Sequence, residues 1–125
     1  MRLSGPTAIH DAVQGARVFA EHNGIAEDSG ARLAIVVEEL VTNLYEHGGL
    51  SDVDPLEIEL ALGAGAIHLV IADQGEPFDP RTARQGNVPA RGGGAGLSLV
   101  RSWASATNYE SSSGTNRLRV ILPLR

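Results

Sequence analysis

The sequence has 125 residues, and this length predicts a single domain, residues 1–125, with one hydrophobic core. Its net charge of -5 and its 10 scattered basic residues argue against direct nucleic-acid binding and against a membrane-surface protein. The chain has no cysteine, which excludes a disulfide framework and a thiolate nucleophile and fits a cytoplasmic location. No apolar leader or long apolar run is present, so we expect neither export nor a membrane span.

Two helices are predicted in the first part of the chain. Apolar residues recur at helical spacing after Thr7, a candidate N-cap, and the pattern stops at Asn23-Gly24, where glycine suits the left-handed end of a helix. A second helix is expected from a cap at Asp28 or Ser29 to about His47. Its apolar stripe indicates that one face packs on a core.

The rest of the chain predicts a sheet and one more helix. Alternating or continuously apolar runs indicate four strands, at residues 56–62, 67–72, 107–112 and 116–122. Residues 1–6 offer at most a brief edge strand, and a third helix is expected to begin near Gly94. These elements predict the α+β class, as a two-layer sandwich in which about three helices cover one face of a mostly antiparallel sheet.

Glu39 and Asn43 stand four residues apart on the second predicted helix, so they project side by side. Helix stability does not require this pair, because asparagine is a mediocre helix former and balances no charge here. Carboxylate and amide oxygens suit a hard cation, and a carboxylate can also act as a base. The pair therefore indicates a cation site or a polarising base, and the structural alternative is a solvated helix face.

A buried strand ends in Asp73-Gln-Gly75, which places a carboxylate at the end of the predicted sheet. A carboxylate there must meet a hydrogen-bond donor, and the exocyclic amine of adenine is one, whereas guanine presents a carbonyl at that position. Gly75 allows the turn to close. The alternative is an aspartate that only caps a loop.

A glycine-rich stretch, residues 92–96, precedes the third predicted helix, and residues 77–91 before it are expected to form a loop over the site. Backbone N–H groups without side chains in the way can cradle phosphates at a helix start. Arg91, just before this stretch, can pair with a terminal phosphate. The alternative is a flexible connector whose glycines ease a tight turn.

The order of these features resembles the three sequence boxes of the GHKL nucleotide-binding superfamily, which includes histidine kinase catalytic domains, Hsp90 and MutL. Within it the chain is most similar to the small anti-sigma-factor serine/threonine kinases, through Glu39-Leu-Val-Thr-Asn43 with His47 after it and through Asp73-Gln-Gly75-Glu-Pro-Phe78-Asp79. The resemblance covers about Leu33 to Leu124. It implies the Bergerat fold of that superfamily, a two-layer α/β sandwich.

The resemblance implies ATP and Mg²⁺ as cofactors. It makes Asn43 the metal ligand, through its amide oxygen, and Glu39 the catalytic group that orients or deprotonates an attacking hydroxyl. Thr115 matches a position that supports the adenine-binding aspartate in relatives, and Arg91 is offset from the family's arginine. The nucleotide-binding residues expected on this basis are Asn43, His47, Asp73, Gly75, Phe78, Arg91, Gly92, Gly93, Gly94, Ala95, Gly96, Leu97 and Thr115.

The leading functional hypothesis is a cytoplasmic bacterial regulator that binds Mg-ATP and phosphorylates serine or threonine on an anti-anti-sigma antagonist. The expected partners are this antagonist, a sigma factor, or both, besides ATP and ADP, and the related kinases suggest a homodimer. One alternative is a module that senses ATP or ADP and sequesters a protein without catalysis. Another is a histidine kinase catalytic domain, which is disfavoured because no dimerising phosphoacceptor segment precedes the domain, although His10 lies on the first predicted helix.

Overall fold

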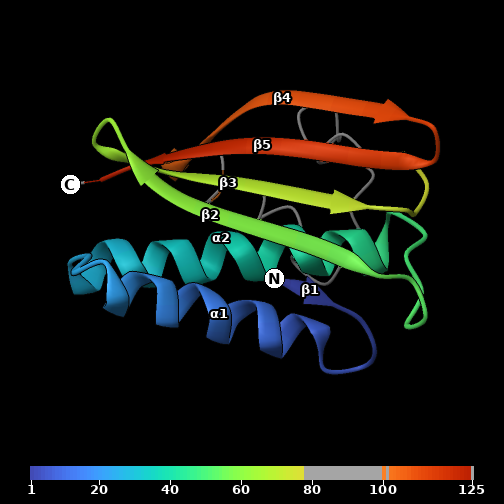
Figure 1. Ribbon diagram of the computed structural model, residues 1–125, viewed down its shortest axis with the longest axis horizontal. Helices are drawn as coiled ribbons and strands as arrows, with labels where there is room; N and C mark the ends of the chain where they lie inside the picture. Colours follow the sequence, from blue (N-terminus) through green and yellow to red (C-terminus); the bar gives the residue numbers. More distant parts are fainter. Residues whose placement is uncertain (78–99, 101, 125) are drawn as a thin grey trace.

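The computed structural model describes residues 1–77, 100 and 102–124, and these form a layer of helices against one face of an antiparallel sheet (Figure 1). The helices are α1, Ala8–His22, and α2, Glu27–Glu46. The strands are β1 (Arg2–Leu3), β2 (Leu56–Gly63), β3 (Ala66–Asp73), β4 (Ser105–Ser112) and β5 (Thr115–Pro123). The predicted α+β two-layer sandwich is confirmed.

The strands follow the order β1-β2-β3-β5-β4, and each pairs with its neighbours in the antiparallel sense. β3 is therefore central, with β2 on one side and β5 on the other, as its continuously apolar sequence predicted. Asp73, the last residue of β3, lies opposite Leu56 of β2 and Asn116 of β5. This register puts the end of β3 beside the start of β5.

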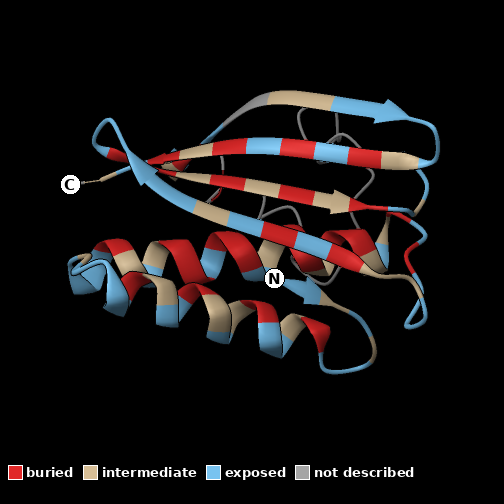
Figure 2. Cartoon of the chain, in the orientation of Figure 1, coloured by how far each residue is buried: buried red, intermediate tan, exposed pale blue. Residues whose placement is uncertain are grey.

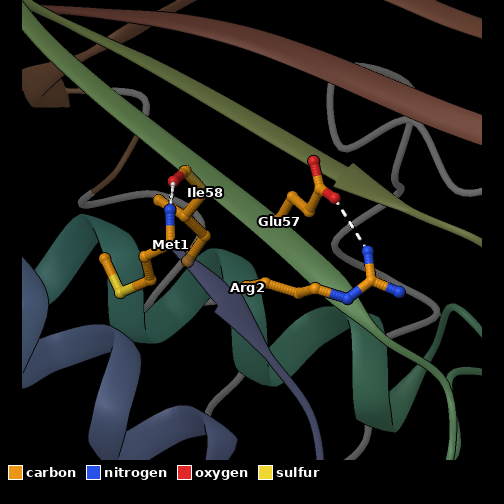
Figure 3. Close-up of polar contacts among 4 residues, drawn as sticks. All are labelled: Met1, Arg2, Glu57 and Ile58. Carbon is orange, nitrogen blue, oxygen red and sulfur yellow. Dashed lines mark hydrogen bonds and ion pairs between the residues drawn. The ribbon is translucent and has the colours of Figure 1, made fainter.

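The short strand β1 makes the sheet five-stranded, where the sequence predicted about four strands. Figure 3 shows how the first residues of the chain lie along β2. The Met1 amine donates to the carbonyl of Ile58 at 2.7 Å, and the Ile58 N–H donates back to the carbonyl of Met1 at 2.8 Å. Arg2 adds an exposed ion pair with Glu57 at 2.9 Å, a contact of the kind that contributes little to stability.

The two helices pack closely because α1 presents small side chains to its neighbours. Its buried residues are alanines at every fourth position, Ala8, Ala12, Ala16 and Ala20. A side chain at Gly30 of α2 would come within 3.3 Å of the Ala20 methyl group, which shows how near the two helices approach at that end. Figure 2 shows the buried faces of both helices and the alternation of buried and exposed residues along β5.

The predicted N-cap position of α1 is confirmed, whereas the predicted start of α2 needs correction. Thr7 is the N-cap of α1, but its hydroxyl donates to the Asp11 carboxylate at 2.9 Å instead of capping the backbone. The prediction that Asp28 or Ser29 caps α2 is wrong, because α2 begins at Glu27. Ser29 is only 3% exposed inside the first turn of α2, so its small side chain serves packing and not capping.

The third predicted helix lies mostly outside the described residues. Val100, Ser102 and Trp103 are helical, and the N–H of Ala104 donates to the carbonyl of Val100 at 2.8 Å. The guanidinium of Arg32 in α2 lies 5.4 Å from the centre of the Trp103 ring, which joins this segment to α2 by a cation–π contact. Among the described helices none is long and apolar enough to cross a membrane.

Candidate functional site

The end of α2 turns one face toward the sheet. Leu40, Asn43 and Leu44 are three and four residues apart, so they share this face. All three are buried, and Asn43 is only 3% exposed. Asn43 therefore points inward among apolar residues, whereas Glu39, one turn earlier, is half-buried at the edge of the same face.

These residues line a pocket between α2 and the sheet. The space between these side chains, open solvent included, is about 320 Å³, and the cavity within it that can hold water is about 20 Å³. Apolar side chains make most of its wall, Asn43 supplies an amide and Asp73 supplies a carboxylate. A mostly apolar wall with a few polar groups is typical of small-molecule sites. Its lining residues are Leu40, Asn43 and Leu44 from α2, Ile71 and Asp73 from β3, Tyr109 from β4 and Leu118 from β5.

Asp73 is 5% exposed and is held by two donors on one oxygen. Its Oδ1 accepts the backbone N–H of Gly75 at 2.8 Å and the Nδ2–H of Asn116 at 3.0 Å. Oδ2 makes no hydrogen bond to another described residue. Because an ionised carboxylate only accepts hydrogen bonds, Oδ2 suits a donor such as the amine of a ligand or a water molecule.

Gly75 brings the turn after β3 against the loop that follows α2. The N–H of Glu76 donates to the carbonyl of Gly48 at 2.8 Å. A side-chain carbon on Gly75 would stand 2.6 Å from that same carbonyl oxygen, which is closer than such atoms approach. Glycine is therefore required for the contact, and the contact fixes the end of α2 relative to Asp73.

Asn43 has an unusual amide for a buried side chain. Its Nδ2 is inaccessible to solvent and has no hydrogen-bond partner among the described residues. Buried polar atoms nearly always have a partner, and an exception calls for a ligand, an ion or water. An inward amide that lacks a protein partner fits a group that is bound in the pocket, and its oxygen is of the ligand type that Mg²⁺ prefers.

Glu39 carries the perturbed carboxylate of this region. Burial raises the pKa of Glu39, the nearby charges of Glu46 and then Glu38 raise it further, and His47 opposes the shift. His47 ends α2, and its N–H donates to the carbonyl of Asn43 at 2.8 Å, which agrees with a role at the helix end. A carboxylate with a raised pKa, one helical turn from a residue that lines a pocket, is a candidate general base.

The structure brings together Glu39, Asn43, His47, Asp73 and Gly75 among the predicted site residues. The support expected from Thr115 comes from its neighbour Asn116, because the β3–β5 register sets Asn116 opposite Asp73 and pairs Thr115 with Ser112 of β4. The remaining predicted residues lie outside the described part of the chain: Phe78, Arg91, Gly92, Gly93, Gly94, Ala95, Gly96 and Leu97.

Besides the apolar residues of the pocket wall, two residues with polar side chains were not predicted as part of the site, Asn116 and Tyr109. Asn116 had a readable signal, because Leu118, Val120 and Leu122 follow it at a period of two on the buried face of β5. A polar residue in that series indicates a buried polar contact. Tyr109 had no comparable signal, since β4 has no apolar alternation.

The sequence from residue 4 to residue 122 matches the model of the histidine kinase-like ATPase domain family. The chain belongs to this family. It is therefore an ATP-binding domain of the histidine kinase-like type, and such domains generally bind ATP together with Mg²⁺. No curated protein matches the sequence.

Several solved structures share the fold. A blue-light activated histidine kinase of Erythrobacter litoralis is 16% identical, with a TM-score of 0.57 over 80% of this chain and 32% of that chain. A chain from the SiaB–SiaC complex of Pseudomonas aeruginosa is 15% identical, with a TM-score of 0.62 over 98% and 88%. The catalytic domain of histidine kinase ThkA is 14% identical, with a TM-score of 0.57 over 99% and 95%.

These identities are low, so the structural neighbours support the fold and not a particular activity. The chain spans about a third of the length of the blue-light activated kinase and under half of the length of the histidine kinase domain from it. The coverage is nearly complete for the ThkA catalytic domain, which confirms the Bergerat type of sandwich.

Proposed function

We propose that this domain uses Mg-ATP to phosphorylate serine or threonine on a protein partner, as the anti-sigma-factor kinases do, in a cytoplasmic partner-switching system. The observation that carries the proposal is the relation of Glu39 to Asn43 and Asp73. Asn43 and Asp73 line one pocket, and Glu39, whose pKa is raised, lies one turn before Asn43 on α2. Base recognition, metal binding and proton transfer are thereby assigned to three neighbouring groups.

Each residue has a distinct task in this proposal. Asp73 accepts a hydrogen bond from the amine of adenine at Oδ2, while apolar residues such as Leu40 and Ile71 contact the base. Asn43 would hold the metal through its amide oxygen. Glu39 orients the attacking hydroxyl and accepts its proton. The bound Mg-ATP supplies the transferred phosphoryl group and the neutralising metal charge.

The partner is proposed to be an anti-anti-sigma antagonist, with a sigma factor as the second partner and a homodimer as the working unit. A structural neighbour of nearly the same length was solved in a complex, SiaB with SiaC, and this favours a protein partner for this chain also.

The test is transfer of labelled phosphate from ATP to the cognate antagonist by wild type, Glu39→Gln and Glu38→Gln. Glu38 is the matched control, because it precedes Glu39 on α2 and is exposed. We expect acid-stable label on the antagonist with wild type and Glu38→Gln, and a loss of about 10²–10⁴-fold with Glu39→Gln. Tight ATP binding without transfer would leave only the sequestering module, and acid-labile label on His10 would support the histidine kinase alternative.

A further inference from the structure

Asn116 is a buried polar residue that hydrogen-bonds to Asp73 at the end of β3. It is 2% exposed and lies on the inner face of β5, directly opposite Asp73 of β3. Burying an amide this deeply costs free energy unless its donors and its acceptor all have hydrogen-bond partners.

The Asn116 amide is fully occupied by the protein itself. Its Nδ2 donates to Asp73 Oδ1 at 3.0 Å and to the carbonyl of Gly75 at 2.8 Å, which uses both N–H hydrogens. Its Oδ1 accepts the hydroxyl of Ser111 at 2.6 Å. Both groups near Nδ2 are acceptors, so the orientation of the amide follows from its partners. Asn116 has no N–H left to donate to a ligand, and any effect on a ligand must pass through Asp73.

We propose that Asn116 is the positioning residue that sets the preference of this site for purines with an amine at C6. By holding Oδ1 of Asp73 against the protein, together with the Gly75 N–H, it leaves Oδ2, which has no partner among the described residues, as the oxygen that can accept from a ligand in the pocket that Asp73 lines. A carboxylate fixed in this way meets the amine without first losing rotational freedom. The inference rests on the proposed binding of adenine by Asp73.

The side-chain type matters for this role. A hydroxyl such as that of threonine has one hydrogen to donate and cannot serve Asp73 and Gly75 together, whereas an amide NH₂ group can. Ser111 completes the arrangement, because its bond to Oδ1 of Asn116 keeps the amide from turning. Residues of β3, β4 and β5 thus cooperate to hold a single carboxylate oxygen.

The experiment compares the affinities of wild type and Asn116→Leu for two probes, ATP and purine riboside triphosphate, which lacks the amine. The measured quantity is the ratio of the two affinities. Asn116→Leu should reduce the preference for ATP by about tenfold while binding of the analogue changes by no more than about twofold, because only the amine contact depends on Asp73. A role limited to folding would weaken both probes equally.

Asn108→Leu is the matched control, since Asn108 donates to the Glu110 carboxylate at 3.0 Å in an exposed contact on β4. Its ratio should equal that of wild type. If Asn116→Leu yields no folded protein, Ser111→Ala is measured in its place. We expect its ratio of ATP affinity to analogue affinity to fall by about threefold. An unchanged ratio in the folded Asn116→Leu, or in Ser111→Ala where that variant decides, overturns the proposal. Wild type without any preference for ATP over the analogue would overturn adenine recognition by Asp73 itself.

Discussion

At the scale of single residues, the charge state of Glu39 should determine the pH dependence of phosphate transfer. A general base must be ionised, and burial with the charges of Glu46 and Glu38 raises the pKa of Glu39. The rate should therefore fall on the acid side with a midpoint above the ordinary carboxyl range. Glu46→Gln removes the larger of the two charge effects, so it should move this midpoint to lower pH. Single-turnover transfer across pH measures it, and a midpoint that stays fixed or rises argues against Glu39 as the base.

The same shift has a consequence for stability. Because the folded-state pKa of Glu39 is raised, its stabilising contribution is present below the unfolded pKa and is lost as pH rises through the folded value. Glutamine does not ionise, so Glu39→Gln should not lose stability as the pH rises through this value. We expect the variant to unfold at the same or a higher temperature than wild type at neutral pH, and the difference to disappear in acid. Thermal unfolding at several pH values measures this, and a clear destabilisation at neutral pH would contradict it.

Asn43 should affect metal dependence more than stability. Its Nδ2 has no partner among the described residues, so Asn43→Ala breaks no hydrogen bond there, although it opens space in the pocket. The variant should bind ATP equally with and without Mg²⁺, because the amide oxygen that holds the metal is gone. Thr42→Ala, at the preceding position, is the control that should keep the Mg²⁺ effect. Titration calorimetry gives the affinities, and a full Mg²⁺ effect in Asn43→Ala would remove Asn43 from the metal site.

At the scale of secondary-structure elements, one contact holds α2 to the end of β3. Gly75→Ala would drive a methyl group into the carbonyl of Gly48 and displace the bond from Glu76, so we expect a destabilisation of about 1–3 kcal/mol together with weaker ATP binding. Gly63→Ala is the control, because a side chain there meets no atom within 4 Å. Denaturant unfolding compares the two variants. Equal stabilities would mean that this contact does not position the site.

The types and approximate bounds of the helices and strands could be predicted from the sequence, whereas the contacts between them could not. The apolar stripe on α2 and the alternation in β2 identified both elements to within a few residues, because their periods are set by burial of one face. The start of α2 was predicted at the wrong residue because Ser29 was interpreted as an N-cap. A capping rule considers only the nearby backbone groups, whereas Ser29 is buried by tertiary packing inside the first turn of α2. Residues 1–6 were expected to offer at most a brief edge strand, and β1 is such a strand, with two residues at the edge of the sheet.

At the scale of the whole molecule, the fold class followed from the order of the motifs along the chain, which also pointed to Asn43 and Asp73, two of the residues that line the pocket. What the sequence did not give was the depth of each side chain and its partner across the sheet. Asn43 was expected on a polar flank and is buried, since the face of a helix that points inward depends on what packs there. Asn116 was passed over in favour of Thr115 because the register of β3 and β5 is fixed by the whole sheet and not by a local pattern.

The claim that the pocket between α2 and β3 recognises adenine can be tested with one substitution, Asp73→Asn. An asparagine keeps an oxygen for the donors on Gly75 and Asn116, but it turns an N–H toward the pocket in place of the free acceptor Oδ2. We predict that calorimetry finds the ATP affinity of this variant reduced about tenfold to a hundredfold, with a thermal unfolding temperature close to that of wild type. A folded Asp73→Asn protein that binds ATP as tightly as wild type would contradict the assignment of this pocket.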